Sequence, residues 1–244
     1  MWTLGFDTTA STVSVALMRD CELVCTYSAS SKTTHSTTLL PVIEQLLEAA
    51  SIKVADLALI CCSAGPGSFT GVRIGCATAK GLAAPFNIPC VGVSAMEAMA
   101  APFKDIECIV CPALNARRGN VYTAVFRSDG NGNVTRLTDD DLLPITDIPS
   151  VIKKAANEAE LASLPVYIAG DSVCEIIDAD ADGWIKKAPA LLQSPSGYGA
   201  ALAGLATFRE NGEDASLFHE GKLAPIYLRK SQAEREKEER AEKK

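Results

Sequence analysis

The first fifty residues change from a two-residue to a helical hydrophobic period. Val13, Val15 and Leu17 alternate with small polar residues, which is typical of a strand with one buried face. Strands are expected at residues 4–7, 12–18 and 22–27, followed by a helix at residues 39–50. A doubly wound fold places a helix directly after its first strand, so three leading strands argue against that fold.

Strands and helices then alternate, and the order strands, helix, strand, helix occurs twice. Further strands are expected at residues 56–63, 89–93, 107–113, 121–126 and 166–170, and further helices at residues 72–84, after Ser94, and at residues 151–162 and 196–208. This order indicates an α/β protein with two related halves. We place an N-terminal lobe at residues 1–102, and a C-terminal lobe at residues 103–230 whose last helix packs back on the first lobe. A charged tail follows at residues 231–244.

The glycine-rich stretch at positions 65–75 reads Gly-Pro-Gly-Ser-Phe-Thr-Gly-Val-Arg-Ile-Gly. It lies between a buried strand and a helix, where backbone N–H groups and the helix dipole favour anions. It lacks the Gly-Lys-Ser/Thr ending of a P-loop. Its glycine spacing and the absence of an acid about twenty residues later also argue against a dinucleotide site.

Two predicted helices carry unusual faces. Gly71, Gly75, Ala79 and Ala83 recur every four residues, so that another helix can approach closely; packing inside the chain is the alternative. In the helix at residues 39–50, apolar side chains cover about 180° of arc, more than the roughly 100° stripe of a surface helix. Since exposed apolar patches usually mark interfaces, this arc favours a partner-binding face over a deeply internal helix.

Composition and charge narrow the function. The chain is 48% hydrophobic and 22% charged, which is typical of a globular protein. A formal charge of -7 argues against nucleic-acid binding by the chain on its own, although a local basic patch is compatible with it. We find no apolar run long enough for a membrane helix and no signal peptide, and so expect a cytoplasmic protein without a membrane role.

The nine cysteines do not predict a disulfide framework or a metal site. Their number is odd, and Cys61 and Cys62 lie inside an apolar run. Cys108 and Cys111 have redox or zinc spacing but fall in a predicted buried strand. The only histidines are His35 and His219. We therefore interpret the cysteines as small buried hydrophobic residues.

The motif at positions 65–75 strongly resembles the signature of the TsaB (YeaZ) family of tRNA threonylcarbamoyladenosine biosynthesis proteins. Further matches cover nearly the whole chain except the tail: Asp7-Thr8-Thr9, His35-Ser36, Leu39-Leu40-Pro41, residues 79–83, Ala116-Arg117-Arg118-Gly119 with Tyr122, and Pro225-x-Tyr227-Leu228-Arg229. The resemblance implies an actin-like (ASKHA, ribonuclease H-like) two-lobed α/β fold with mixed sheets flanked by helices.

The resemblance also implies a function. The chain would be a non-catalytic subunit required to form the threonylcarbamoyl group on the tRNA adenosine beside the anticodon. It would bind the catalytic paralogue TsaD together with TsaE, form a homodimer when alone, and meet tRNA only through the complex. The residues implied in partner binding are His35, Leu39, Leu40, Ile43, Leu47, Phe69, Val72, Arg73, Gly75 and Ala79.

Two departures bear on the chemistry. Asp7-Thr8-Thr9 replaces the glycine-bearing turn of actin-like ATPases, so a vestigial nucleotide site is expected, with no cofactor, and ATP or ADP only in the complex. Asn115 stands where the family usually has Asp, which keeps a hydrogen-bond acceptor but loses its charge. Arg117 and Arg118 are candidate RNA or interface contacts, with local salt bridges as the alternative.

No catalytic or metal-binding set is recognisable. The two histidines lie too far apart for the helical pair that holds a metal in the paralogue, and no Ser-His-Asp or Cys-His set is evident. The alternative function is a free-standing actin-like ATPase or small-molecule kinase, or a peptidase. In that case Asp7 would anchor a metal-bound nucleotide.

Overall fold

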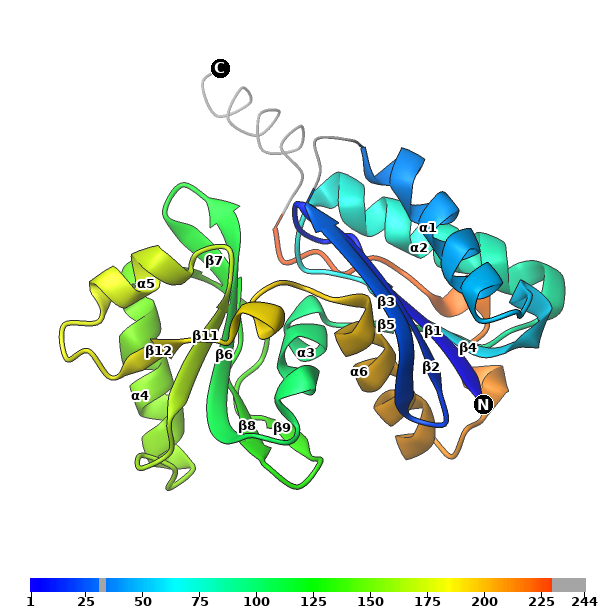
Figure 1. The fold of residues 1–244 in the computed structure, drawn as a ribbon. Coiled ribbons are helices and arrows are strands. Elements are labelled where there is room, and N and C mark those ends of the chain that lie inside the picture. Colours follow the sequence, from blue (N-terminus) through cyan, green and yellow to red (C-terminus); the bar gives the residue numbers. More distant parts are fainter. Residues whose placement is uncertain (31–33, 230–244) are drawn as a thin grey trace, which may run out of the picture.

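The computed structural model describes residues 1–30 and 34–229, so the predicted tail lies outside the described residues. Two α/β lobes lie side by side, each built on one sheet (Figure 1). The first sheet has the order β3-β2-β1-β4-β5, comprising β1 (Trp2–Asp7), β2 (Thr12–Arg19), β3 (Glu22–Ser30), β4 (Leu57–Ser63) and β5 (Cys90–Val93). The second has the order β10-β7-β6-β11-β12, and β8 pairs with β6 and β9.

The strands of the second sheet are β6 (Glu107–Arg117), β7 (Asn120–Thr123), β8 (Phe126–Asp129), β9 (Val134–Arg136), β10 (Asp141–Pro144), β11 (Val166–Gly170) and β12 (Ile185–Lys187). The helices are α1 (His35–Ala49), α2 (Phe69–Ala83), α3 (Ala95–Ala100), α4 (Ile148–Glu158), α5 (Val173–Ala179) and α6 (Gly197–Glu210). No helix among the residues that the structure describes is long and apolar enough to cross a membrane.

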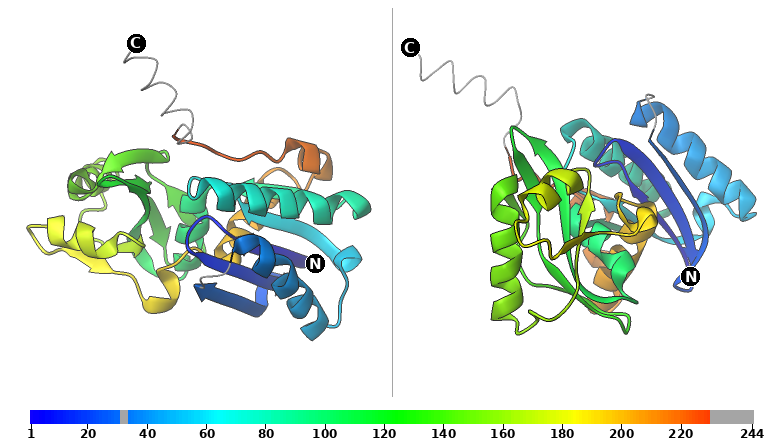
Figure 2. Two further views of the ribbon diagram at one scale, coloured as in Figure 1. Left: turned by 90° about the horizontal axis from the view of Figure 1, so that it is seen from above. Right: turned by 60° about the vertical axis from the view of Figure 1, so that its left-hand side comes forward.

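The N-terminal meander predicted from the sequence is confirmed. β1 pairs with β2, and β2 with β3, in antiparallel fashion. β4 pairs with β1, and β5 with β4, in parallel fashion. Successive side chains of a strand point to opposite faces. Accordingly Leu4 and Phe6 belong to the core beneath α1 and α2, while Leu59 and Cys61 belong to the core beneath α6. α6 thus covers the opposite face of the first sheet (Figures 1 and 2).

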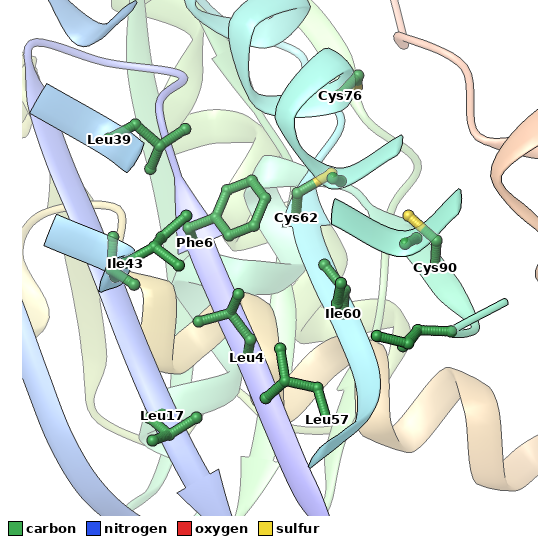
Figure 3. Packing of buried hydrophobic residues seen from close by; sticks show 14 of the residues in the cluster. Leu4, Phe6, Leu17, Leu39, Ile43, Leu57, Ile60, Cys62, Cys76 and Cys90 are labelled. Atoms are coloured by element: carbon green, nitrogen blue, oxygen red, sulfur yellow. The ribbon is translucent and has the colours of Figure 1, made fainter. Parts of the chain in front are cut away.

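α1 is buried more completely than its sequence predicts. Leu39, Ile43 and Leu47 are 1%, 2% and 5% exposed, and Figure 3 shows Leu39 and Ile43 beside Phe6. The chain's own core covers most of the apolar arc, because β2, β3 and α2 all contact the helix, while Leu40 and Ala49 stay exposed. Leu40, at 50% exposed, is the large apolar residue of the arc that stays exposed.

The small-residue stripe of α2 also faces inward. A Cβ atom on Gly75 would lie 2.7 Å from Thr8 Oγ1, and Ala79 is fully buried. Of the two expectations for the stripe, packing inside the chain is the one seen here: Gly71 and Gly75 meet Thr8, in the turn after β1. The helix also begins at Phe69, three residues before the expected start at Val72. Ser68 is its N-cap and accepts a hydrogen bond from Gly71 N at 3.3 Å.

The second lobe is built around β6. Cys108 and Cys111 point to opposite faces of this strand, and both are buried, as predicted. Burial raises the pKa of the Cys108 thiol to about 11 and that of the Cys111 thiol to about 12, so both stay protonated near neutral pH. The single strand predicted at residues 121–126 is wrong. It is split into β7 and β8, which pair with different halves of β6.

Gly75 and Gly81 of α2 form a matched pair for testing the internal stripe. Gly75→Ala should lower the free energy of unfolding by about 1–3 kcal/mol, because the added methyl group overpacks against Thr8. Gly81→Ala has open space around it and should raise that free energy by about 0.5–1 kcal/mol. Urea denaturation measures both. Equal effects at the two positions would contradict the inward orientation of the stripe.

Candidate functional site

A cleft of about 930 Å³ opens between the two lobes. Its first wall is the turn after β1, from Thr9 to Ser11, together with the loop that leads into α2. Its second wall is the end of β6 with Tyr122 and Asp171. Residues 226–229 also line the cleft. A volume of this size is in the range of small-molecule and cofactor sites.

The acid predicted for a vestigial nucleotide site does not line this cleft. Asp7 is fully buried, and its Oδ1 accepts hydrogen bonds from Thr9 N at 2.8 Å and Thr9 Oγ1 at 2.9 Å. Burial raises the pKa of the Asp7 carboxyl, and hydrogen bonds partly oppose that rise. Of the predicted site residues Asp7, Thr8 and Thr9, only Thr9 lines the cleft. The Asp7 carboxylate is thus satisfied by its own turn.

The glycine-rich loop packs against the same turn. Ser68 N donates to Thr9 O at 2.7 Å, and Thr8 Oγ1 donates to Gly71 O at 2.7 Å. A Cβ atom on Gly67 would lie 2.6 Å from Thr9 O. The amide of Ser68 therefore bonds within the chain and is not directed at the cleft. The loop has the sequence position of a phosphate-binding loop; its Ser68 amide and Gly67 pack against the turn after β1, while residues 66–70 line the cleft.

The hairpin between β6 and β7 carries the two candidate RNA-contacting arginines. Arg117 and Arg118 are exposed and line the cleft, with φ angles of 66° and 57°. Arg117 N donates to Asn115 Oδ1 at 2.7 Å, so Asn115 acts as the acceptor expected of it. Neither arginine forms an ion pair within the described residues, and the salt-bridge alternative therefore has no support there.

Residues 225–229, which we call the strap, connect the lobes. Tyr227 stacks on Phe69 of α2 with ring centroids 4.6 Å apart. Arg73 lies over Phe69 at 4.0 Å, and its Nε donates to Tyr227 Oη at 2.8 Å. Arg229 reaches across and donates to Ala116 O at 2.6 Å. The strap thus ties the first turn of α2 to the end of β6.

The predicted partner-binding residues occupy different environments. Leu40 and Arg73 are exposed; His35 and Phe69 are partly buried and line the cleft, where His35 Nε2 bonds Ala10 O at 2.8 Å. The remaining members lie buried in the chain: Leu39, Ile43, Leu47, Val72, Gly75 and Ala79. The structure therefore does not bring the ten residues together on one surface.

A second hollow lies between α1 and the end of α2. It has a volume of about 410 Å³ and is lined by Leu40, Ile43, Leu47, Ile52, Val54 and Leu82, with Glu44, Glu48 and Lys53 also contributing. We call it the α1–α2 groove. Sequence reasoning identified α1 but missed Ile52, Val54 and Leu82, because they lie outside the predicted apolar arc and the small-residue stripe. Only the fold shows that these three side chains pack against the same core as α1.

Two lobes with mixed, helix-flanked sheets and a cleft between them define the actin-like class of proteins. Residues 27–237 match the model of the family described as "TsaD: tRNA N6-adenosine threonylcarbamoyltransferase". The tRNA threonylcarbamoyladenosine biosynthesis protein TsaB of Bacillus subtilis is 34% identical over 154 residues, which cover 63% of this chain and 67% of that protein. TsaB of Escherichia coli is 36% identical over 131 residues, which cover 53% of this chain and 56% of that protein.

Similarity in structure extends further along the chain. YeaZ from Pseudomonas aeruginosa superposes with a TM-score of 0.70 at 21% identity, covering 93% of this chain and 99% of that one. At this identity the likeness concerns the fold. The family assignment rests on the sequence matches. The chain belongs to the TsaB (YeaZ) family.

The strap can be tested by hydrogen exchange. Tyr227→Ala removes both the stack on Phe69 and the acceptor for Arg73, so amides of residues 226–229 should exchange faster while global stability falls by no more than about 1–1.5 kcal/mol. Tyr227→Phe keeps the stack and should have a smaller effect. Unchanged exchange in the alanine variant would show that these contacts do not hold the strap.

Proposed function

We propose that this protein is a non-catalytic subunit required for formation of the threonylcarbamoyl group on tRNA. The modified position is the adenosine next to the anticodon. In this role the chain binds TsaD and, together with TsaE, supports it. The observation that carries the proposal is the α1–α2 groove in a chain of the TsaB family. An apolar hollow beside an exposed leucine is the kind of surface that partner proteins cover.

The groove suits a helix of a partner protein. Its floor is aliphatic, from Ile43, Leu47 and Leu82, and charged side chains stand among its lining residues. An apolar centre with a polar rim is the usual anatomy of a protein interface. In the absence of TsaD, two copies of this chain would cover the same surface on each other, since a two-fold pairing of identical patches also removes it from water.

Catalysis in this proposal belongs to the partner. Supporting this, His35 and His219 bond backbone groups in separate parts of the chain, through Ala10 O and Gly221 N. Asp7 is bound within its own turn, which disfavours the role of metal-nucleotide anchor. We therefore propose that the chain itself takes no cofactor and that ATP or ADP binds only in the complex. We also propose that the protein is cytoplasmic. A free-standing ATPase, kinase or peptidase remains the alternative function.

The groove predicts which substitutions break assembly without unfolding. Leu40→Glu places a carboxylate at the proposed contact, and burying it unpaired is costly. Because Leu40 is 50% exposed, stability should change by less than about 0.5 kcal/mol. We expect at least a tenfold weaker complex with co-expressed TsaD, and a weaker homodimer, by size-exclusion chromatography and titration.

Leu191→Glu is the matched control for this variant. Leu191 is 94% exposed on the second lobe, away from the groove, and its substitution should leave both assemblies unchanged. Wild-type assembly of the folded Leu40→Glu variant with TsaD would place the interface elsewhere.

A second prediction separates the subunit from the alternative enzyme. The purified chain, supplied with threonylcarbamoyl adenylate and tRNA, should transfer no threonylcarbamoyl group, and it should hydrolyse no ATP when TsaD is absent. Turnover in either assay by the chain alone, lost in Asp7→Asn, would replace the proposed function with a free-standing activity.

A further inference from the structure

Three arginines from two parts of the chain line the interlobe cleft. Arg117 and Arg118 come from the β6–β7 hairpin, and Arg229 comes from the strap. We propose that the mouth of this cleft binds the phosphodiester backbone of a single-stranded RNA segment through these three guanidinium groups. The inference rests on the proposed role in tRNA modification and assigns the RNA-contacting surface within it.

The backbone conformation of the hairpin disfavours arginine, which indicates that Arg117 and Arg118 are present for their charge. β6 ends at Arg117 and β7 begins at Asn120, so Arg118 and Gly119 form a two-residue turn with φ angles of 57° and 73°. Positive φ at both central positions defines a type I′ turn, which favours Asn-Gly. Arg117 also has a positive φ, of 66°. Two consecutive arginines thus occupy conformations better suited to Asn or Gly, and such strain gathers at functional sites.

The charges in the cleft favour an anion although the chain as a whole is acidic. The charged side chains lining it are these three arginines and Asp171. Asp171 already accepts a hydrogen bond from Asn115 N at 2.6 Å, and burial raises the pKa of its carboxyl. Arg117 and Arg118 form no ion pair with a described carboxylate. Their guanidinium groups are therefore available to phosphate oxygens, which they bind in bidentate fashion.

The neighbouring groups suit a strand of RNA better than a free nucleotide. Tyr122 lines the cleft, and Tyr227 is 42% exposed beside it, so aromatic faces lie close to the cations, as in single-strand binding grooves. On the opposite wall, the amide of Ser68 bonds Thr9 O and the carboxylate of Asp7 bonds Thr9. The Ser68 amide and the Asp7 carboxylate are thus already bonded within the chain, whereas Arg117 and Arg118 are exposed.

The variants follow from the turn geometry. Arg117→Asn with Arg118→Asn removes both charges and supplies the residue that left-handed backbone prefers, so thermal stability should stay the same or rise. The control is Arg19→Asn with Arg209→Asn, which removes two exposed arginines on the first lobe and gives the same formal charge, -7 minus 2, or -9.

The measurement is fluorescence anisotropy of the isolated chain with a labelled oligouridine of about 10 nucleotides, within the ~4–16 nucleotides that single-strand grooves cover. Binding is titrated at several salt concentrations. We expect weak, salt-dependent binding by the wild type and at least a tenfold loss in the hairpin double variant at low salt. The slope of log K against log salt should fall by about 1.4, or about 0.7 for each phosphate contact. The control variant should retain most of the affinity.

Each other outcome overturns the inference. An absence of oligouridine binding at low salt, or equal losses in the hairpin and control variants, would show that the cleft has no RNA site. If AMP or ATP binds and the hairpin variant loses that binding while keeping RNA, the site is for a nucleotide. If the hairpin variant loses TsaD and keeps RNA, the arginines belong to the protein interface. Since Leu40→Glu tests TsaD binding on another surface, failure of either proposal is recognisable separately.

Discussion

The first lobe depends on one close approach, in which the start of α2 lies directly against the turn that follows β1. Gly67, Gly71 and Gly75 supply the room for it, because a Cβ atom at any of these positions would collide with Thr8 or Thr9. Two hydrogen bonds stabilise the contact: Thr8 Oγ1 donates to Gly71 O, and Ser68 N donates to Thr9 O. Helix glycines cost roughly 0.5–1 kcal/mol each in an exposed helix, and here the close backbone contact offsets that cost.

This approach also decides what the cleft can do. With the loop amide and the Asp7 carboxylate turned inward, the first wall offers mainly hydroxyl groups and an aromatic ring, while the positive charge comes from the second wall and the strap. Phe69, the first residue of α2, is placed where Tyr227 stacks on it. The strap in turn presents Arg229 to the end of β6. An aromatic stack contributes about 0.5–1.5 kcal/mol and an exposed cation–π contact about 0.5–1 kcal/mol, so the strap is held in place by weak interactions.

The α1–α2 groove and the interlobe cleft are chemically distinct surfaces. The groove is aliphatic and lies on the outer side of the first lobe, whereas the cleft is polar and cationic and lies between the lobes. A fold does not by itself define a function, so the actin-like architecture explains where a cleft occurs and not what it binds. In this chain the Asp7 carboxylate and the Ser68 amide are bonded internally, and Arg117, Arg118 and Tyr227 are among the exposed residues of the cleft.

Local pattern was sufficient for most elements of the fold. Alternation identified β2, and strands were expected where β1, β3 and β4 lie. The helix expected after Ser94 is α3, and the Ser94 hydroxyl caps it by accepting from Met96 N at 3.0 Å. Residues 65–75 were enough to indicate the TsaB family. The division of residues 121–126 between two strands was not visible, because its cause is pairing with different halves of β6.

The orientation of helix faces was decided by tertiary structure alone. A stripe of Gly71, Gly75, Ala79 and Ala83 fits against a second helix or against the end of a strand, since both need only a surface without side chains. The sequence does not state which one is near, and the fold places Thr8 there. In the same way, the Phe69, Arg73 and Tyr227 cluster joins positions more than 150 residues apart, as the 154-residue separation of Arg73 and Tyr227 illustrates. Sequence determined which residues could form these contacts; long-range packing chose their partners.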